Sequence, residues 1–152
     1  MKDKICLITG TASGMGRIAA KSLAEKGATL VLVDFDTENG LIARDEMIEA
    51  TGNNSIEYID CDVSSFSDLH RLSDHIHEHY SRLDVLINNA GITESMRREN
   101  EDGFEMTLAT NFLGPFLLTH LMLDLLQAAA PSRIINISSD AHRMVKEFDF
   151  DD

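Results

Sequence analysis

The 152-residue chain is long enough for one compact domain and too short for two of ordinary size. Hydrophobic residues make up 43% of it and charged residues 26%, a balance typical of globular proteins rather than disordered ones. Its 26 acidic and 13 basic residues give a formal charge of −13, which repels nucleic acids and anionic membranes, so we expect no nucleic-acid partner.

Short apolar segments rich in Ile, Val and Leu recur along the chain and lack the strict alternation of a strand with one wet face. Such segments are typical of strands that helices cover on both faces. They predict five strands, at Ile5–Thr9, Thr29–Asp34, Ser55–Asp60, Val85–Asn88 and Arg133–Ser138.

Segments with helical periodicity alternate with these strands. They predict helices at Met15–Lys26, Thr37–Thr51, Ser65–Tyr80 and about Asp102–Ala129. Gly27 and Gly52 stand where helix ends are expected, and Ser64 is expected to cap the third helix. This alternation predicts an α/β fold, a doubly wound parallel sheet with right-handed crossovers in a single domain.

No segment resembles a signal peptide or a membrane span. Residues 1–4 are polar, and the most apolar segment, Phe112–Ala130, is interrupted by Pro115 and Asp124, so it predicts a buried or interface helix. Cys6 and Cys61 lie far apart in strand-like surroundings, and we expect both to be buried free thiols. A reducing, cytoplasmic location is the corresponding expectation.

The first predicted strand leads into a glycine-rich loop, Thr9-Gly-Thr-Ala-Ser-Gly-Met-Gly16, and then into a helix. Glycines permit a tight turn and a close approach of a pyrophosphate, while the helix start offers free N–H groups and a positive dipole end. These local features would offset the acidic charge of the whole chain. They predict a dinucleotide site at Gly10, Ser13, Gly14, Met15 and Gly16.

Asp34 ends the second predicted strand, 18 residues after Gly16, where an acid can accept hydrogen bonds from the adenosine ribose hydroxyls. The same carboxylate would repel the 2′-phosphate of NADP. Ser13 and Phe35, where a cation could bind that phosphate, are neither Lys nor Arg. The residues therefore favour NAD over NADP. A solvated acid at a strand end is the alternative interpretation of Asp34.

Four further motifs follow in order: Asp62-Val63, Asn88-Asn-Ala-Gly91, Asn111, and Asn136-Ile-Ser-Ser139. With the glycine loop, they make the chain resemble the short-chain dehydrogenase/reductase family, from its first residues to about Arg143. The segments 111–119 and 131–139 resemble the retinol-dehydrogenase-like branch in particular. That branch often prefers NADP, so an acid at the end of the second strand departs from its usual pattern.

The resemblance implies a Rossmann-type doubly wound sheet with strand order 3-2-1-4-5 and a ligand at the carboxyl ends of the strands. It implies an oxidoreductase that interconverts an alcohol and a carbonyl with NAD. Asp62 and Val63 would meet the adenine ring. The motif after the fourth strand would border the ribose and nicotinamide and tie the central sheet together, through Asn88, Asn89, Ala90 and Gly91. Ordinary capping or packing is the alternative role for each.

The resemblance also implies two catalytic positions. Asn111 would sit at an irregularity of the long helix and hold a water of a proton relay, and Ser139 would hydrogen-bond the substrate oxygen. Ser138 is expected to point into the packing of the sheet instead.

The family's general acid/base is a Tyr followed four residues later by Lys. Here Tyr58 and Tyr80 are followed by Asp62 and Asp84. The chain is therefore interpreted as the N-terminal, NAD-binding part (residues 1–152) of a longer dehydrogenase and is predicted to be inactive alone. The alternative is a truncated, non-catalytic NAD-binding module, or a pseudoenzyme, that acts through subunit association.

Two features concern partners other than the small-molecule substrate. Leu117, Leu118, Leu121 and Leu125 recur at helical spacing, and the resemblance implies a homo-oligomer through the long helix 102–129. His75 and His79 share a helix face at a spacing that can bind zinc, but no third ligand is evident, so no metal site is predicted.

Overall fold

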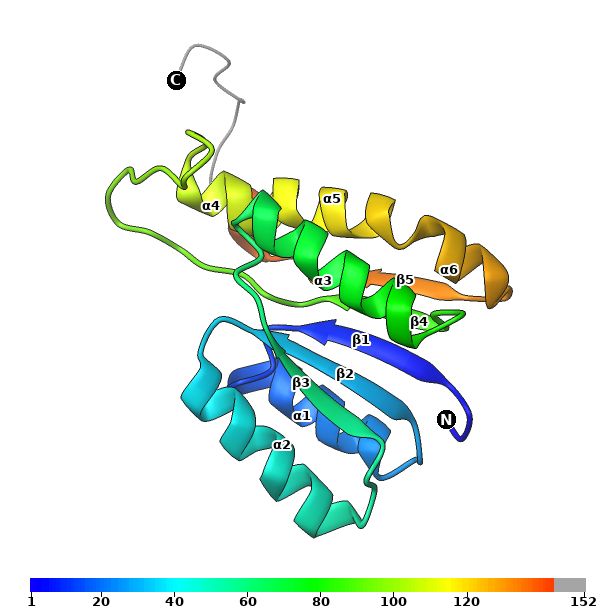
Figure 1. Cartoon of the computed structure of the whole chain (residues 1–152). Coiled ribbons are helices and arrows are strands. Elements are labelled where there is room, and N and C mark those ends of the chain that lie inside the picture. Colours follow the sequence, from blue (N-terminus) through cyan, green and yellow to red (C-terminus); the bar gives the residue numbers. More distant parts are fainter. Residues whose placement is uncertain (144–152) are drawn as a thin grey trace.

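The computed structural model describes residues 1–143. Five parallel strands form one sheet in the order β3-β2-β1-β4-β5, which confirms the predicted doubly wound class and strand order (Figure 1). The strands are β1 (Ile5–Thr9), β2 (Thr29–Asp34), β3 (Ile56–Asp60), β4 (Val85–Asn88) and β5 (Arg133–Asn136).

Helices cover both faces of this sheet (Figure 1). One face carries α1 (Gly14–Ala24) and α2 (Thr37–Thr51), and the other carries α3 (Phe66–His79) together with the helices of residues 106–128. Along β1, Leu7 joins one hydrophobic cluster while Cys6 and Ile8 join the other. Because successive side chains of a strand point to opposite faces, burial on both faces explains the absence of polar alternation in the strand sequences.

The long predicted helix is the main difference between the expected and the observed elements. It begins at Met106 rather than near residue 102, because the Glu105 carboxylate caps the first turn by accepting from the N–H groups of Thr107 and Leu108. It is also divided into four successive pieces: α4 (Met106–Leu108), the π-helix η1 (Ala109–Leu113), α5 (Gly114–Leu121) and α6 (Leu123–Ala128).

Smaller corrections concern element ends. Ser65, not Ser64, caps α3, since its hydroxyl accepts from the Asp68 N–H. Gly52 has φ of 68° and ends α2 as predicted, whereas α1 already ends at Ala24, before Gly27. Strand β5 stops at Asn136, so the two serines of the 136–139 motif lie beyond the sheet and are followed by the short 3₁₀-helix η2 (Asp140–Arg143).

A buried carboxylate fixes the start of β1 against the segment that leads into β4. The Asp84 side chain is 2% exposed and accepts from Lys4 Nζ at 2.7 Å and from the Ile5 N–H at 3.0 Å, with Arg82 Nε at 3.3 Å. Burial alone would raise the pKa of Asp84, but these donors and cations lower it below its ordinary value. These contacts thus fix the register of β1 relative to β4 at the amino ends of the two strands, opposite the glycine loop and the Asn-Asn-Ala-Gly motif.

Both cysteines are buried and free, as predicted. Burial raises the pKa of the Cys6 thiol to about 11 and that of Cys61 to about 12, so both remain protonated and unreactive at neutral pH. Within residues 1–143, none of the helices has the length and apolar character needed to cross a bilayer.

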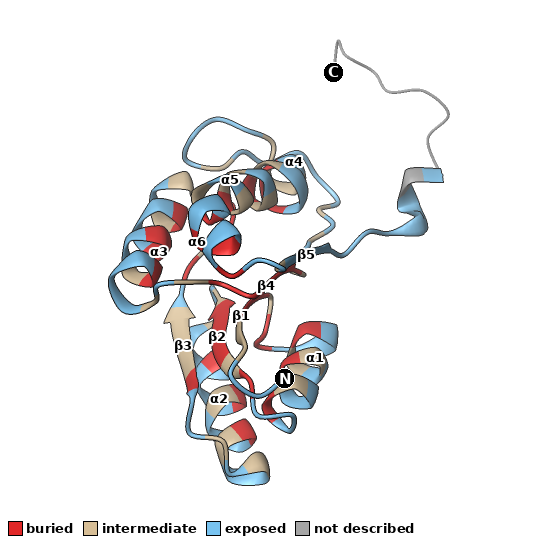
Figure 2. Cartoon of the chain, turned by 90° about the vertical axis from the view of Figure 1, so that its right-hand side faces the viewer, coloured by how far each residue is buried: buried red, intermediate tan, exposed pale blue. Residues whose placement is uncertain are grey.

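The exposed apolar surface does not lie where the leucine spacing predicted it. Leu118 and Leu125 are buried, and the partly buried Leu117 and Leu121 pack against the same cluster, so these four residues contribute to the core of the domain. One group of exposed apolar side chains lies on β5, drawn in pale blue in Figure 2, and on η1, α5 and α6: Phe112, Phe116, Leu123, Ile134 and Ile135.

We predict that the 152-residue chain self-associates at micromolar concentration. Strand β5 pairs only with β4 among the described strands, so its other edge leaves backbone groups that can pair with another chain. Removing one exposed aromatic ring from water contributes roughly 1.5–3 kcal/mol. Sedimentation velocity should show species larger than the monomer, and Phe116→Ser should shift the distribution towards it.

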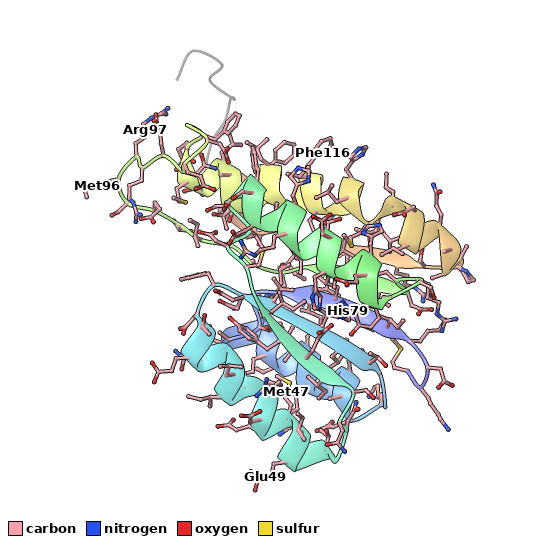
Figure 3. All side chains as sticks on the ribbon, in the orientation of Figure 1. Met47, Glu49, His79, Met96, Arg97 and Phe116 are labelled. Carbon is pink, nitrogen blue, oxygen red and sulfur yellow. The ribbon has the colours of Figure 1, made fainter. Side chains whose placement is uncertain are left out.

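The matched control is Met96→Ser, on the loop before α4; Phe116 and Met96 are 67% and 75% exposed, and both are labelled in Figure 3. This change should leave the distribution unaltered. A sharp monomer that melts cooperatively and binds no dye for apolar surface would contradict the prediction.

Candidate cofactor and active site

The glycine loop after β1 is shaped by two close backbone approaches. Gly10 has φ of 73°, and a Cβ built on it would lie 2.8 Å from the Cα of Ala90. A Cβ on Gly16 would lie 2.0 Å from the carbonyl oxygen of Gly10. A side chain at Gly10 would therefore push the loop away from the end of β4, and one at Gly16 would push it away from α1.

Four hydrogen bonds join this loop to the segment after β4. The Thr9 hydroxyl accepts from the N–H groups of Asn89 and Ala90 at 3.0 and 3.1 Å. The Asn89 amide donates to the carbonyls of Thr9 and Gly10 at 2.9 and 3.0 Å. The Asn89 side chain thus positions the loop, a role that the resemblance did not specify beyond tying the sheet together.

The first turn of α1 keeps its N–H groups available. Ser13 precedes the helix but makes no side-chain cap, whereas Asp36 and Ser65 cap α2 and α3 with side-chain oxygens. Four N–H groups at a helix start have no partner within the helix, and together with the helix dipole they attract an anion. The open turn at Ser13 and Gly14 is thus chemically suited to a pyrophosphate.

Asp34 is fixed at the carboxyl end of β2 by two backbone donors. Its Oδ2 accepts from the Ala12 N–H at 2.8 Å and its Oδ1 from the Asp36 N–H at 3.1 Å. The carboxylate therefore joins the glycine loop to the start of α2. Because each carboxylate oxygen can accept about two hydrogen bonds, it retains capacity for hydroxyl donors.

These groups surround one pocket at the carboxyl ends of the strands, which we call the cofactor pocket. Ten of the twelve residues predicted to contact the cofactor line it: Gly10, Ser13, Gly14, Met15, Asp34, Asp62, Val63, Asn89, Ala90 and Gly91. Of the other two, Gly16 lies behind the loop and permits its close packing, and Asn88 lines a second pocket instead. The sequence motifs missed a further part of the wall, formed by the segment before α4 and by α4 and η1: Ile92, Glu94, Arg98, Met106 and Thr110.

The Asp62-Val63 motif forms the wall between β3 and α3. Asp62 Oδ1 accepts from the Ser64 N–H at 2.8 Å, and the Asp62 N–H donates to Asp68 at 3.1 Å. This Asx turn fixes both residues at the pocket edge. The turn leaves Asp62 and Val63 able to make the adenine contacts that the resemblance implies, although one Asp62 carboxylate oxygen already accepts from a backbone N–H.

Asn111 lies in the π-helix η1, at the irregularity that the resemblance implied. Its Oδ1 accepts from the Ile92 N–H and its Nδ2 donates to the Ile92 carbonyl, both at 2.9 Å. The amide therefore anchors the segment after β4 that carries Asn89, Ala90 and Gly91. Asn111 itself lines a second pocket, together with Asn88, Phe116, Thr119, Asn136 and Ser138.

The two serines after β5 are both exposed. Ser138 lines the second pocket and does not pack into the sheet, contrary to the expectation, because β5 ends before it. The Ser139 hydroxyl accepts from the Ala141 N–H at 3.2 Å at the start of η2. Ser139 and Asn111 thus do not line one described pocket, whereas Ser138 and Asn111 do.

Neither tyrosine lies in these pockets. The Tyr58 hydroxyl donates to the Asp34 carbonyl at 2.7 Å, and the Tyr80 hydroxyl donates to Glu57 at 2.6 Å. Burial raises the pKa of Tyr58 to about 12, and burial with the Glu57 bond raises the pKa of Tyr80 as well. Both tyrosines therefore have structural roles.

The histidines of α3 are used in local contacts. His75 and His79 stack with ring centroids 4.1 Å apart, and His75 Nε2 lies 3.2 Å from Glu57. Across residues 1–143, no three His, Cys, Asp or Glu side chains converge as a metal site would require.

Comparison with known proteins agrees with the geometry. A model of the short chain dehydrogenase family matches residues 4–148. The chain belongs to this family. Retinol dehydrogenase 13 of Homo sapiens is 40% identical to this family member over 149 residues, which cover 98% of the chain and 45% of the relative. The resemblance to the retinol-dehydrogenase-like branch is therefore confirmed, and the chain spans less than half the length of this relative.

Solved structures lead to the same family. A protein from Mycobacterium Paratuberculosis is 35% identical with a TM-score of 0.76, covering 93% of this chain and 48% of that one. A metagenomic short-chain oxidoreductase (SDR) in complex with NADP is 28% identical with a TM-score of 0.80, covering 91% and 63%. The Rossmann-type fold is confirmed. The family binds a nicotinamide cofactor, and the uncapped N–H groups at the start of α1 are suited to the pyrophosphate of such a cofactor.

We predict that Gly16→Ala weakens dinucleotide binding at least tenfold, about 1.4 kcal/mol. The added methyl would lie 2.0 Å from the Gly10 carbonyl oxygen, so the loop must move away from α1. Calorimetry with NAD measures the effect, and Lys21→Ala on the exposed side of the same helix is the control. Equal affinity of the Gly16→Ala variant and the unaltered chain would contradict this account of the loop.

Proposed function

We propose that this chain binds NAD in the cofactor pocket and forms the cofactor-binding part of an oxidoreductase that interconverts an alcohol and a carbonyl. The observation that carries the proposal is Asp34, fixed by the Ala12 and Asp36 N–H groups at the pocket's edge. The uncapped start of α1 supports pyrophosphate binding beside it. The family membership supports the reaction class.

The preference for NAD over NADP rests on charge. A 2′-phosphate carries more than one negative charge near neutral pH and would approach both Asp34 and Asp36, which line the same part of the pocket. Arg98 is the single Lys or Arg among the described lining residues, and it pairs with Glu94 at 3.2 Å. Two ribose hydroxyls, in contrast, can donate to a fixed carboxylate.

Ser139 and Asn111 remain the proposed catalytic positions. When bound, the nicotinamide would supply hydride transfer, and Ser139 would hydrogen-bond the substrate oxygen where charge develops. Asn111 would act by holding Ile92, and hence the wall beside the nicotinamide, through its two backbone bonds. The proposed substrate is an alcohol or a carbonyl compound.

A second candidate is a non-catalytic NAD-binding module that acts through association with other subunits. The positions of Tyr58 and Tyr80 favour it, because both hydroxyls are used in structural bonds away from the pockets. Two buried thiols with raised pKa values are consistent with either candidate working in a reducing compartment such as the cytoplasm.

We predict that the chain binds NAD at least tenfold more tightly than NADP, about 1.4 kcal/mol, because of Asp34. Isothermal titration with both cofactors measures the ratio. Replacing Asp34 with Ala and Phe35 with Arg should narrow or reverse it, because a cation then replaces the carboxylate. Equal or tighter binding of NADP by the unaltered chain would contradict the proposed preference for NAD.

Turnover should be absent from the 152-residue chain even where NAD binds. The expected proton donor, a tyrosine with its pKa lowered by a nearby lysine, has no counterpart in Tyr58 or Tyr80. NADH formation would be followed spectroscopically with a panel of secondary alcohols and retinoids. Turnover at ordinary enzyme rates that Ser139→Ala abolishes would favour the first candidate for the chain by itself.

A further inference from the structure

A cation beside the adenosine end of the cofactor pocket is held by a residue of another helix. Arg17 follows the last glycine of the loop, and its guanidinium pairs with the Glu46 carboxylate of α2. The same guanidinium donates to the Ala12 carbonyl at 3.5 Å. Arg17 does not line the cofactor pocket in this arrangement.

Ala12 places this cation close to the Asp34 carboxylate. Its N–H binds Asp34 at 2.8 Å while its carbonyl contacts the Arg17 guanidinium, so the backbone of a single residue separates the two charges. The Arg17 side chain is about one-third exposed and reaches this point from the first turn of α1. Rotation of such a long side chain can move its charge by several ångströms.

We propose that Glu46 contributes to cofactor selectivity by holding Arg17 away from the position of a 2′-phosphate. This inference rests on the proposed NAD site and adds a specificity-determining residue outside its wall. Asp34 would disfavour the phosphate by direct repulsion. Glu46 would act indirectly, because its ion pair holds the Arg17 guanidinium. That guanidinium could otherwise bind the phosphate through two parallel hydrogen bonds.

The physical basis is competition between two anions for one guanidinium. Glu46 is 62% exposed, so its pair with Arg17 contributes little to stability and can be exchanged at small cost. A phosphate offers higher charge and the same bidentate geometry. Removing the Glu46 charge removes the competitor, and Arg17 then becomes available to NADP while NAD, without the phosphate, gains nothing.

The test compares Glu46→Gln with Glu49→Gln in the 152-residue chain. Both changes remove one exposed acidic charge from α2, but Glu49 lies at the end of the helix away from the glycine loop (Figure 3). A double variant, Arg17→Ala with Glu46→Gln, removes the cation as well. Titration with NAD and NADP gives the dissociation constants, and far-UV circular dichroism verifies that each variant is folded.

Glu46→Gln should tighten NADP binding by about fivefold and change NAD binding less than twofold. The fivefold figure corresponds to the free energy that one exposed ion pair contributes. Glu49→Gln should change both constants equally, and the double variant should lose the gain. An equal effect of Glu46→Gln and Glu49→Gln, or a gain that persists without Arg17, would overturn the inference.

These outcomes are separate from those of the NAD proposal. An unaltered chain that prefers NADP contradicts NAD as cofactor, while the role of Glu46 is judged only by the change that its replacement causes. A chain that binds neither cofactor overturns both.

Discussion

The joint between the ends of β1 and β4 is the constraint on which the candidate site depends. Asn89 and Ala90 donate four hydrogen bonds across it to Thr9 and Gly10, and Gly10 fits only because it lacks a side chain. The joint places the uncapped start of α1 beside the Asn-Asn-Ala-Gly segment. If it opened, the start of α1 and the Asn-Asn-Ala-Gly segment would no longer face one space.

Because the chain carries a formal charge of −13, the attraction of an anionic ligand depends on positive potential close to its binding site. The free N–H groups of α1 supply positive potential at one point, and Asp34 supplies a directed acceptor nearby. Asp34 is also structural, since it joins the Ala12 backbone to the start of α2. A substitution there would therefore alter the geometry of the loop as well as the charge at the edge of the pocket.

Much of this arrangement could be predicted from the sequence, because the strands have distinctive apolar runs and the motifs follow them directly. Ten of the twelve residues predicted to contact the cofactor line one pocket for that reason. What failed depended on tertiary contacts: helical spacing alone could not tell that Leu118 and Leu125 face the core. The early end of β5, and with it the exposure of Ser138, has no local sequence signal.

The π-helix η1 shows why the long helix had to be irregular. An extra residue in the turn moves Asn111 out of the regular helical path, and there its amide binds both backbone groups of Ile92. Ile92 lines the cofactor pocket, whereas Asn111 lines the second pocket. One amide thus couples the two cavities. A substitution in the helix that moved Asn111 would displace Ile92 in the wall of the cofactor pocket without contacting a bound ligand directly. Its effects on cofactor binding and on substrate binding would therefore appear together.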